Sequence, residues 1–249
     1  MNLFLYAVGF LLFLLITYQI VRRNQTIAWI VFLICPFLLL PFAIHQNSSY
    51  FVWIKVYSVC LGASWLLVCR YTSLAQKKWA LWLLWCGFAL NIVEAVIEAF
   101  FSGDYLNYVN ALPGILLFFT LPLPKEIQID TSNDRRDLLW NTPMMWIIGY
   151  SIWNWTFLYI TWPEFGLRHL VILSASLLVG IGNNKLWIQS RAFVLGIYLL
   201  IHFSYDLLLQ PLNLPTVYYF PLALTMVGAG LIWMIMYYIT TRLRSTPVR

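Results

Sequence analysis

Three polar side chains share one face of a long apolar segment near the middle of the chain. The stretch Trp79–Phe101 has 23 residues, and a helix needs about 20 to span a bilayer. Asn91, Glu94 and Glu98 are spaced three and four residues apart, so a helix places them on one face. A charge at mid-bilayer costs about 2.5–3.5 kcal/mol. This face must therefore turn toward protein or water, where a carboxylate can bind a cation or exchange a proton.

Other polar side chains fall within or beside apolar segments, and we expect them to gather around this acidic face. They comprise a lysine, further amides, a histidine and an aspartate, which suit the recognition of a charged or hydrogen-bonding ligand. The predicted ligand-binding residues are Lys55, Asn91, Glu94, Glu98, Asn107, Asn110, Asn154, His202 and Asp206.

Several of these residues also have a purely structural interpretation. Lys55 paired with Glu94 or Glu98 would fix the register of two helices without touching a ligand. Asn154 would serve equally well as a hydrogen-bonding link between helices. The chain has only three histidines and no zinc-type spacing, so we predict no metal site and no cofactor.

The composition places these residues in a membrane protein. Of 249 residues, 62% are apolar and 10% are charged, whereas soluble domains carry about 25% charged residues. Repeated apolar runs predict an all-α fold, a polytopic transmembrane helical bundle in which residues 1–249 form a single transmembrane domain. The net charge of +6 comes from basic residues between these runs, so we expect no nucleic-acid partner.

The apolar runs predict about nine spans, with seven to nine as the range. Prolines 36 and 41 should kink the second span. The fifth is interrupted by Pro113-Gly114, which favours a broken or re-entrant segment, and the seventh is barely long enough to cross. The predicted spans are residues 2–21, 27–44, 51–69, 79–101, 105–122, 143–162, 169–181, 187–209 and 217–241.

The connections between the predicted spans alternate regularly between basic and non-basic. With the N-terminus outside and the C-terminus cytoplasmic, the cytoplasmic connections hold nearly all of the basic residues and the external connections hold Arg168. The positive-inside rule favours this orientation and makes residues 124–139 a cytoplasmic loop. Most polar groups of the spans then lie in their external halves. The sequence therefore predicts a polar cavity open to the external side, with an apolar floor.

Several short segments carry a resemblance to a known family. They are Lys55-Val56-Tyr57-Ser58, Asn91 to Ile97, the pair Asn107 and Asn110 before Gly114, Tyr150 to Asn154, and Gln189-Ser190-Arg191-Ala192. In order and content they resemble an uncharacterised family of bacterial multi-pass membrane proteins, a domain of unknown function. The resemblance implies a multi-pass protein of the bacterial inner membrane and no particular reaction.

Three functional hypotheses follow from the predicted cavity. The first is a small-solute transporter or permease, whose small-molecule ligand binds in the external-side cavity, with Glu94 binding a cationic group or a coupling proton. The second is an intramembrane enzyme acting on a lipid or a periplasmic-side substrate, with Glu94 as acid or base and His202 with Asp206 as an oriented pair. The third is a membrane receptor or assembly partner. Membrane lipids are expected neighbours in all three, and a homo-oligomer or a membrane partner protein is compatible with each.

Overall fold

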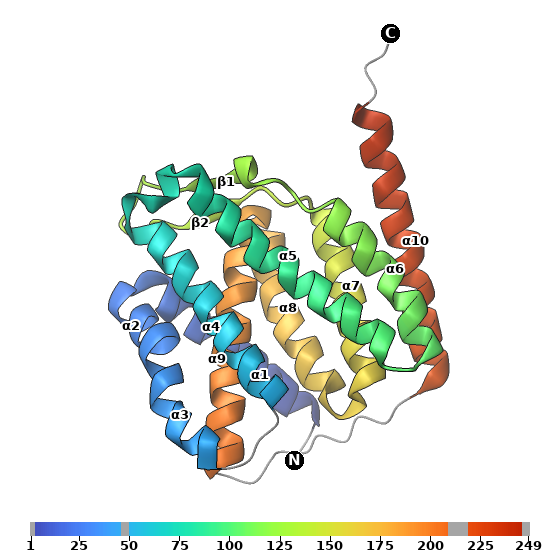
Figure 1. Ribbon diagram of the computed structural model, residues 1–249, viewed down its shortest axis with the longest axis horizontal. Coiled ribbons are helices and arrows are strands. Elements are labelled where there is room, and N and C mark those ends of the chain that lie inside the picture. Colours follow the sequence, from blue (N-terminus) through green and yellow to red (C-terminus); the bar gives the residue numbers. More distant parts are fainter. Residues whose placement is uncertain (1–2, 46–49, 209–218, 246–249) are drawn as a thin grey trace.

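Nine helical segments run back and forth along one axis in the part of the chain that the structure describes (Figure 1). The structure is a computed structural model that describes residues 3–45, 50–208 and 219–245. A π-helical turn, Ile30–Ile34, joins α2 and α3 into one segment. The helices are α1 (Leu3–Arg23), α2 (Gln25–Trp29), α3 (Cys35–His45), α4 (Tyr50–Tyr71), α5 (Lys78–Phe101), α6 (Tyr105–Phe119), α7 (Met144–Thr161), α8 (Gly166–Gly182), α9 (Trp187–Leu208) and α10 (Phe220–Ser245).

Each predicted span coincides with one of these segments. Among the described residues, four stretches are long and apolar enough to cross a membrane, namely Phe4–Arg23, Lys78–Phe101, Pro163–Gly182 and Phe220–Thr241. Large apolar side chains cover the outer surface, among them Phe101 with 82% and Leu90 with 64% of their area exposed. Soluble monomers rarely expose so continuous an apolar surface, so both observations support a membrane protein.

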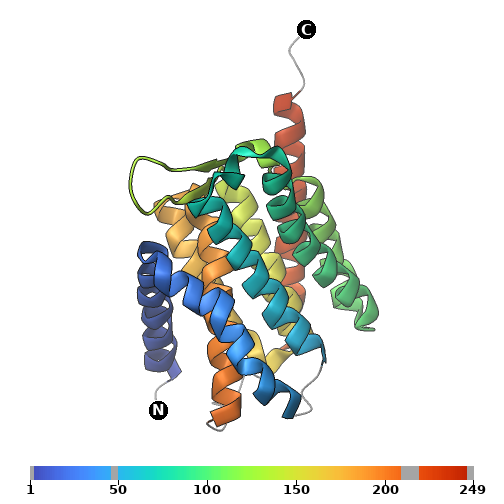
Figure 2. The same cartoon turned by 60° about the vertical axis from the view of Figure 1, so that its left-hand side comes forward.

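A small β-hairpin lies across one end of the bundle (Figure 2). The sequence predicted an all-α fold with a loop of residues 124–139 at this position. Strand β1 (Ile127–Ile129) pairs antiparallel with β2 (Leu138–Trp140). Their alternating apolar side chains bury Ile127, Leu138 and Trp140 against the bundle, and this burial stabilises a hairpin too short to be stable alone. The remaining short elements are 3₁₀ turns at Ser73–Gln76, Pro124–Glu126, Pro163–Phe165 and Asn184–Leu186.

The prolines act differently in the two helical segments where breaks were expected. Pro36 cannot donate to the Phe32 carbonyl, and that oxygen instead accepts a hydrogen bond from Ser64 Oγ of α4 at 3.1 Å. The π-helical turn immediately before Pro36 accommodates the irregularity. By contrast, α6 is one continuous helix through Pro113, so the expected interruption of the fifth span is wrong. Gly114 is required there, because a Cβ atom would lie 2.7 Å from the Trp153 ring.

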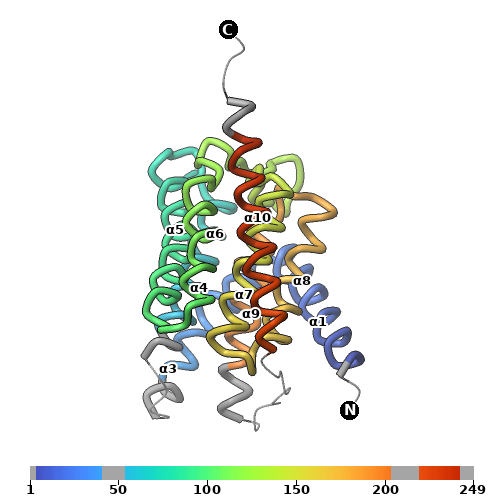
Figure 3. The backbone as a smooth tube through the Cα atoms, turned by 90° about the vertical axis from the view of Figure 1, so that its right-hand side faces the viewer, coloured from blue at the N-terminus to red at the C-terminus, as the bar shows by residue number. Residues whose placement is uncertain are grey.

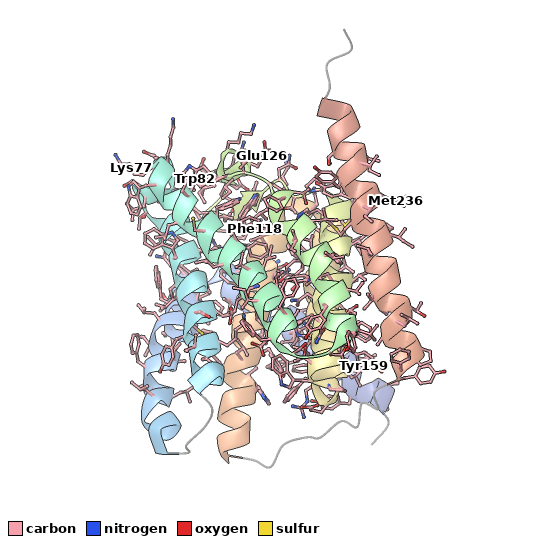
Figure 4. The ribbon with its side chains drawn as sticks, turned by 45° about the vertical axis from the view of Figure 1, so that its right-hand side comes forward. Lys77, Trp82, Phe118, Glu126, Tyr159 and Met236 are labelled. Atoms are coloured by element: carbon pink, nitrogen blue, oxygen red, sulfur yellow. The ribbon has the colours of Figure 1, made fainter. Side chains whose placement is uncertain are left out.

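The two ends of the bundle differ in charge. Lys77 and Glu126 lie at the hairpin end, and Tyr159 lies at the opposite end (Figure 4). The basic residues at the end of α1, the end of α4 and the start of α9 are also at the hairpin end, because all three helices contact the hairpin or its flanks. Helix α10 packs beside α6 and α7 and finishes at the hairpin end (Figure 3). The predicted segregation of basic side chains to one end is therefore present in the fold.

Candidate functional site

A partly buried lysine joins the acidic face of α5 to α4. Lys55 Nζ donates to Asn91 Oδ1 at 2.9 Å and to Glu94 Oε2 at 2.8 Å. The Lys55 and Glu94 side chains keep 25% and 35% of their area exposed. Because Asn91 and Glu94 lie one turn apart on the same helix face, a single ammonium group reaches both. The structure thus brings together three of the predicted site residues.

A second polar cluster surrounds the amide of Asn154 on α7. Its Oδ1 atom lies 2.7 Å from His169 Nε2 of α8 and 3.1 Å from Arg191 Nη2 of α9. Since the amide oxygen only accepts, Nε2 is the protonated ring nitrogen of His169 in this contact. All three residues are buried, with at most 7% of each exposed.

Tyr150 of α7 connects the two clusters. Its hydroxyl oxygen accepts a long hydrogen bond, 3.5 Å, from Asn91 Nδ2. Its ring faces the Arg191 guanidinium, with 5.9 Å between the guanidinium carbon and the ring centroid, which is within cation–π range. A continuous chain of contacts therefore runs from Lys55 on α4 to His169 on α8, through α5, α7 and α9. We call this chain of contacts the central polar network; its residues are Lys55, Asn91, Glu94, Tyr150, Asn154, His169 and Arg191.

A cavity of about 460 Å³ lies beside the central polar network, between α4, α5 and α9. This volume is in the range of small-molecule sites, about 300–1,000 Å³. Most of its wall is apolar, and the polar network contributes Asn91, Glu94, Tyr150 and Arg191. The cavity also reaches Trp140 of the hairpin.

The position of this cavity differs from the polar external cavity that the sequence predicts. At about 1.5 Å rise per residue, Arg191 is about 6 Å from the hairpin end of α9 and Glu94 about 24 Å from that end of α5. The cavity therefore extends from beneath the hairpin to past the middle of the bundle. It is mostly apolar because the polar side chains bond to one another across helices instead of lining an open space.

The chain matches one family model over most of its length. That model is described as a Family of unknown function (DUF5692), and the match covers residues 1–220. The chain belongs to this family. The resemblance to an uncharacterised family is thereby confirmed. No curated protein and no solved structure matches the chain. The match ends where α10 begins, so the cavity and the central polar network of this DUF5692 protein lie entirely within it.

Three other predicted site residues of the DUF5692 chain lie apart from the network. Asn107 bonds Ser102 and Thr161 hydroxyls at 3.1 Å each, and Asn110 donates to the Trp153 carbonyl at 3.3 Å. These bonds tie α6 to its preceding turn and to α7, which is a structural role. His202 stacks on the Tyr198 ring at 5.5 Å between ring centroids.

The last two predicted residues add no contact to the network. The Glu98 carboxylate makes no hydrogen bond or ion pair with any residue that the structure describes. The side chain of Asp206 falls outside the described part of the chain. Sequence reasoning had not placed Tyr150, His169 and Arg191 in the site, because spacing along the chain carries no signal for contacts between distant helices.

A separate buried polar cluster lies at the hairpin end of the DUF5692 chain. From the sequence, its charged residues were interpreted only as loop charges. Arg22 donates from Nε to Asp137 Oδ1 at 2.9 Å and from Nη2 to Oδ2 at 2.6 Å. Gln189 Nε2 donates to the same carboxylate at 3.0 Å, while its Oε1 accepts from the Leu138 amide at 2.8 Å. We call this group, with Arg70, the hairpin clamp.

Arg70 completes the hairpin clamp from α4. It is fully buried and donates to the backbone carbonyls of Arg22, Arg135 and Arg136. Burial alone would raise the pKa of Asp137, but the hydrogen bonds from Arg22 and Gln189 and the two arginine charges hold that pKa below its ordinary value. The clamp therefore fixes the hairpin to α1, α4 and α9 with a charged carboxylate at its centre.

Proposed function

We propose that this protein is a membrane carrier that binds a bilayer-partitioning small molecule in the cavity between α4, α5 and α9. The observation that carries the proposal is that the cavity opens sideways, through the apolar surface of the bundle. Leu61 of α4 and Leu83 and Leu90 of α5 line it and are themselves at least half exposed on the outer surface. A molecule dissolved in lipid would reach such a site without crossing a polar surface.

Two contacts keep α4 and α5 together on either side of this opening. Trp65 Nε1 donates to the Ala80 carbonyl at 3.1 Å near the hairpin end, and Lys55 bonds Asn91 and Glu94 farther along. Between these contacts, Gly62 and Gly87 both line the cavity, and a Cβ added at either would meet no atom within 4 Å. The absence of two side chains at facing positions keeps the opening wide.

The membrane placement that accompanies this proposal follows the charges. The hairpin end carries the basic connections, so the positive-inside rule places it on the cytoplasmic side. All nine helical segments then cross the membrane, with the N-terminus outside and the C-terminus in the cytoplasm. A bacterial inner membrane is the location that the family resemblance favours. The ligand site would begin near the cytoplasmic surface and extend past the middle of the bilayer.

Photolabelling of the protein in lipid nanodiscs tests the binding step. The probe is a long-chain alcohol that carries a diazirine, and labelled peptides are identified by mass spectrometry. We expect label on the cavity-facing residues of α4, α5 and α9. Gly87→Leu should reduce this label at least tenfold because it fills the opening, whereas Gly9→Leu, at an open glycine of α1 outside the cavity, should leave it unchanged. Label spread over all outer helix faces, and equal in the three proteins, would contradict the proposal.

A transport assay separates a carrier from an enzyme. In proteoliposomes, the protein should speed the movement of a fluorescent lysophospholipid between leaflets, measured as the fraction that an external quencher reaches with time. The rate should fall in Gly87→Leu, and the recovered probe should be chemically unchanged. A chemically altered probe without faster exchange would favour the intramembrane enzyme with Glu94 as its acid or base.

A further inference from the structure

One arginine in the cavity wall is buried without a counter-charge. Arg191 is 4% exposed, and only its Nη2 atom has a hydrogen-bond partner, the neutral Asn154 amide. Its Nε and Nη1 atoms have no acceptor among the described residues. A buried donor without a partner destabilises the folded protein, and more so when the group is charged.

Within the part of the chain that the structure describes, no acidic side chain forms an ion pair with Arg191. Glu94, the acidic residue of the cavity wall, is already paired with Lys55 at 2.8 Å. Asp206 lies 15 residues farther along the same helix, which places it about 22 Å away along the axis. The Tyr150 ring supplies only a weak cation–π attraction. Lys55, Glu94 and Arg191 together therefore carry one excess positive charge, which resides on Arg191.

A second unpartnered donor lies at the same end of the cavity. Trp140 of β2 is fully buried in the cavity wall, and its indole N–H has no acceptor among the described residues. Arg191 and Trp140 thus both carry unpaired donors, whereas the acceptors Asn91 and Glu94 of the same wall already bond Lys55. Buried donors also lack partners elsewhere, as in Arg168 and Trp187, but those residues do not line the cavity. Because a buried donor tends to be paired, this end of the cavity suits a ligand that brings its own acceptors.

We propose that the hairpin end of the cavity binds the oxyanion of an amphipathic ligand, a carboxylate or a phosphate, at Arg191, with the Trp140 N–H as a second donor. The alkyl part of the ligand then lies along the apolar wall toward the opening between α4 and α5. This assignment rests on the proposed carrier function and adds the charge and orientation of the cargo. Charge-assisted hydrogen bonds are about twice as strong as neutral ones, so the headgroup would dominate selectivity.

A paired-probe experiment tests this assignment at pH 8 in phosphatidylcholine nanodiscs. A diazirine fatty acid is compared with the alcohol of the same chain length, and half-saturation of cavity label is measured for each. In the wild type the acid should saturate at a concentration at least tenfold lower than the alcohol does. Arg191→Gln should remove this preference while keeping label by the alcohol, and Arg191→Lys should restore part of it. The melting temperature of each variant confirms that it is folded.

Arg168 offers a matched control within the same protein. It is also buried, 7% exposed, and also lies over an aromatic ring, Phe165, but it is not part of the cavity wall. Arg168→Gln should keep the preference for the acid. Equal saturation by acid and alcohol in the wild type, with both dependent on Gly87, would overturn the anion site and leave the carrier function standing. Competition by inorganic phosphate at the same concentration as the fatty acid would also overturn it, because the site would then be one for free anions.

Discussion

The buried arginines of the hairpin clamp and the buried arginine of the cavity wall differ in their partners, because only the clamp contains a carboxylate. In the hairpin clamp, Arg22 and Arg70 surround Asp137, and Arg70 also donates to three backbone carbonyls. In the cavity wall, Arg191 bonds a neutral amide and faces an aromatic ring. The clamp charges are neutralised within the chain, which fits a role in the fold, whereas Arg191 lies in a cavity wall without a counter-charge, which fits the proposed role in ligand binding. We therefore expect mutations in the clamp to change stability and mutations at Arg191 to change binding.

The largest effect should come from removing the carboxylate of the hairpin clamp. Asp137→Asn leaves two buried guanidinium groups with only neutral acceptors, which should lower the free energy of unfolding by about 3–5 kcal/mol. The measurement is a denaturing-detergent titration followed by circular dichroism. Asp134→Asn is the control, because Asp134 is exposed in the same hairpin, and its effect should stay within about 0.5 kcal/mol. Equal stability of the two variants would show that the clamp does not hold the fold.

The same carboxylate should make stability depend on acidity. The folded-state pKa of Asp137 lies below its ordinary value of 3.8, so folding favours the ionised form. Its contribution is complete above about pH 4 and is lost as the pH falls through the folded-state pKa. Acid titration of the wild type and of Asp137→Asn should show a steeper loss below pH 4 in the wild type only. Parallel curves would contradict the assignment of a charged carboxylate to the clamp.

The amide at the centre of the polar network should have a smaller effect. Asn154→Leu removes the acceptor shared by His169 and Arg191, which should cost about 1–3 kcal/mol. Asn141→Leu, at an exposed amide beside the hairpin, provides the comparison in the same denaturation assay. If the two variants have equal free energies of unfolding, the contacts of Asn154 contribute no more to stability than those of a surface amide.

The pair of Lys55 and Glu94 should contribute less to the free energy of unfolding than the Asn154 amide does, because both side chains are partly exposed. A double-mutant cycle with Lys55→Met and Glu94→Gln should give a coupling free energy of about 0.5–1 kcal/mol. A coupling free energy of zero would mean that the 2.8 Å contact is not maintained in solution. Loss of probe exchange in Glu94→Gln, with stability retained, would add a role in transport to the structural one.

The smallest change in stability should follow loss of the uncompensated arginine. In delipidated protein, Arg191→Met removes a buried charge that lacks a partner, so the melting temperature should stay equal or rise. Arg70→Met should lower it by several degrees, because three backbone carbonyls lose their donor. If Arg191→Met lowered the melting temperature as much as Arg70→Met does, Arg191 would be a structural arginine. The contrast between the two regions would then be lost.

The helices could be predicted from the sequence, and their contacts only in part. The apolar runs define the helical segments; for example, the predicted span 79–101 corresponds to helix α5, Lys78–Phe101. Lys55 could be connected to Glu94 because both carry charges in neighbouring apolar segments, where an unpaired charge is expensive. The hairpin was overlooked although its signal is present, since Ile127 and Ile129 alternate with Gln128 before a run of turn-forming residues.

The form of the cavity could not be predicted from the position of polar residues. Reasoning from depth assumed that polar side chains would line an open space, but the Nδ2 groups of Asn107 and Asn110 bond neighbouring residues of the bundle instead. The contact of Arg191 with Asn154 joins residues 37 apart in the chain, and no pattern within either helix specifies it. Packing of α4 and α5 around Gly62 and Gly87, which determines the opening, likewise depends on the tertiary structure.

The central claim is that the cavity binds an amphipathic anion at Arg191. The most direct test is a crystal structure of the protein, from crystals grown in a lipid phase that contains a long-chain alkyl phosphate. The account predicts density for the alkyl chain between α4, α5 and α9, with a phosphate oxygen within hydrogen-bond distance of Arg191. An empty or collapsed cavity, or an Arg191 guanidinium paired with a carboxylate of the protein itself, would contradict it.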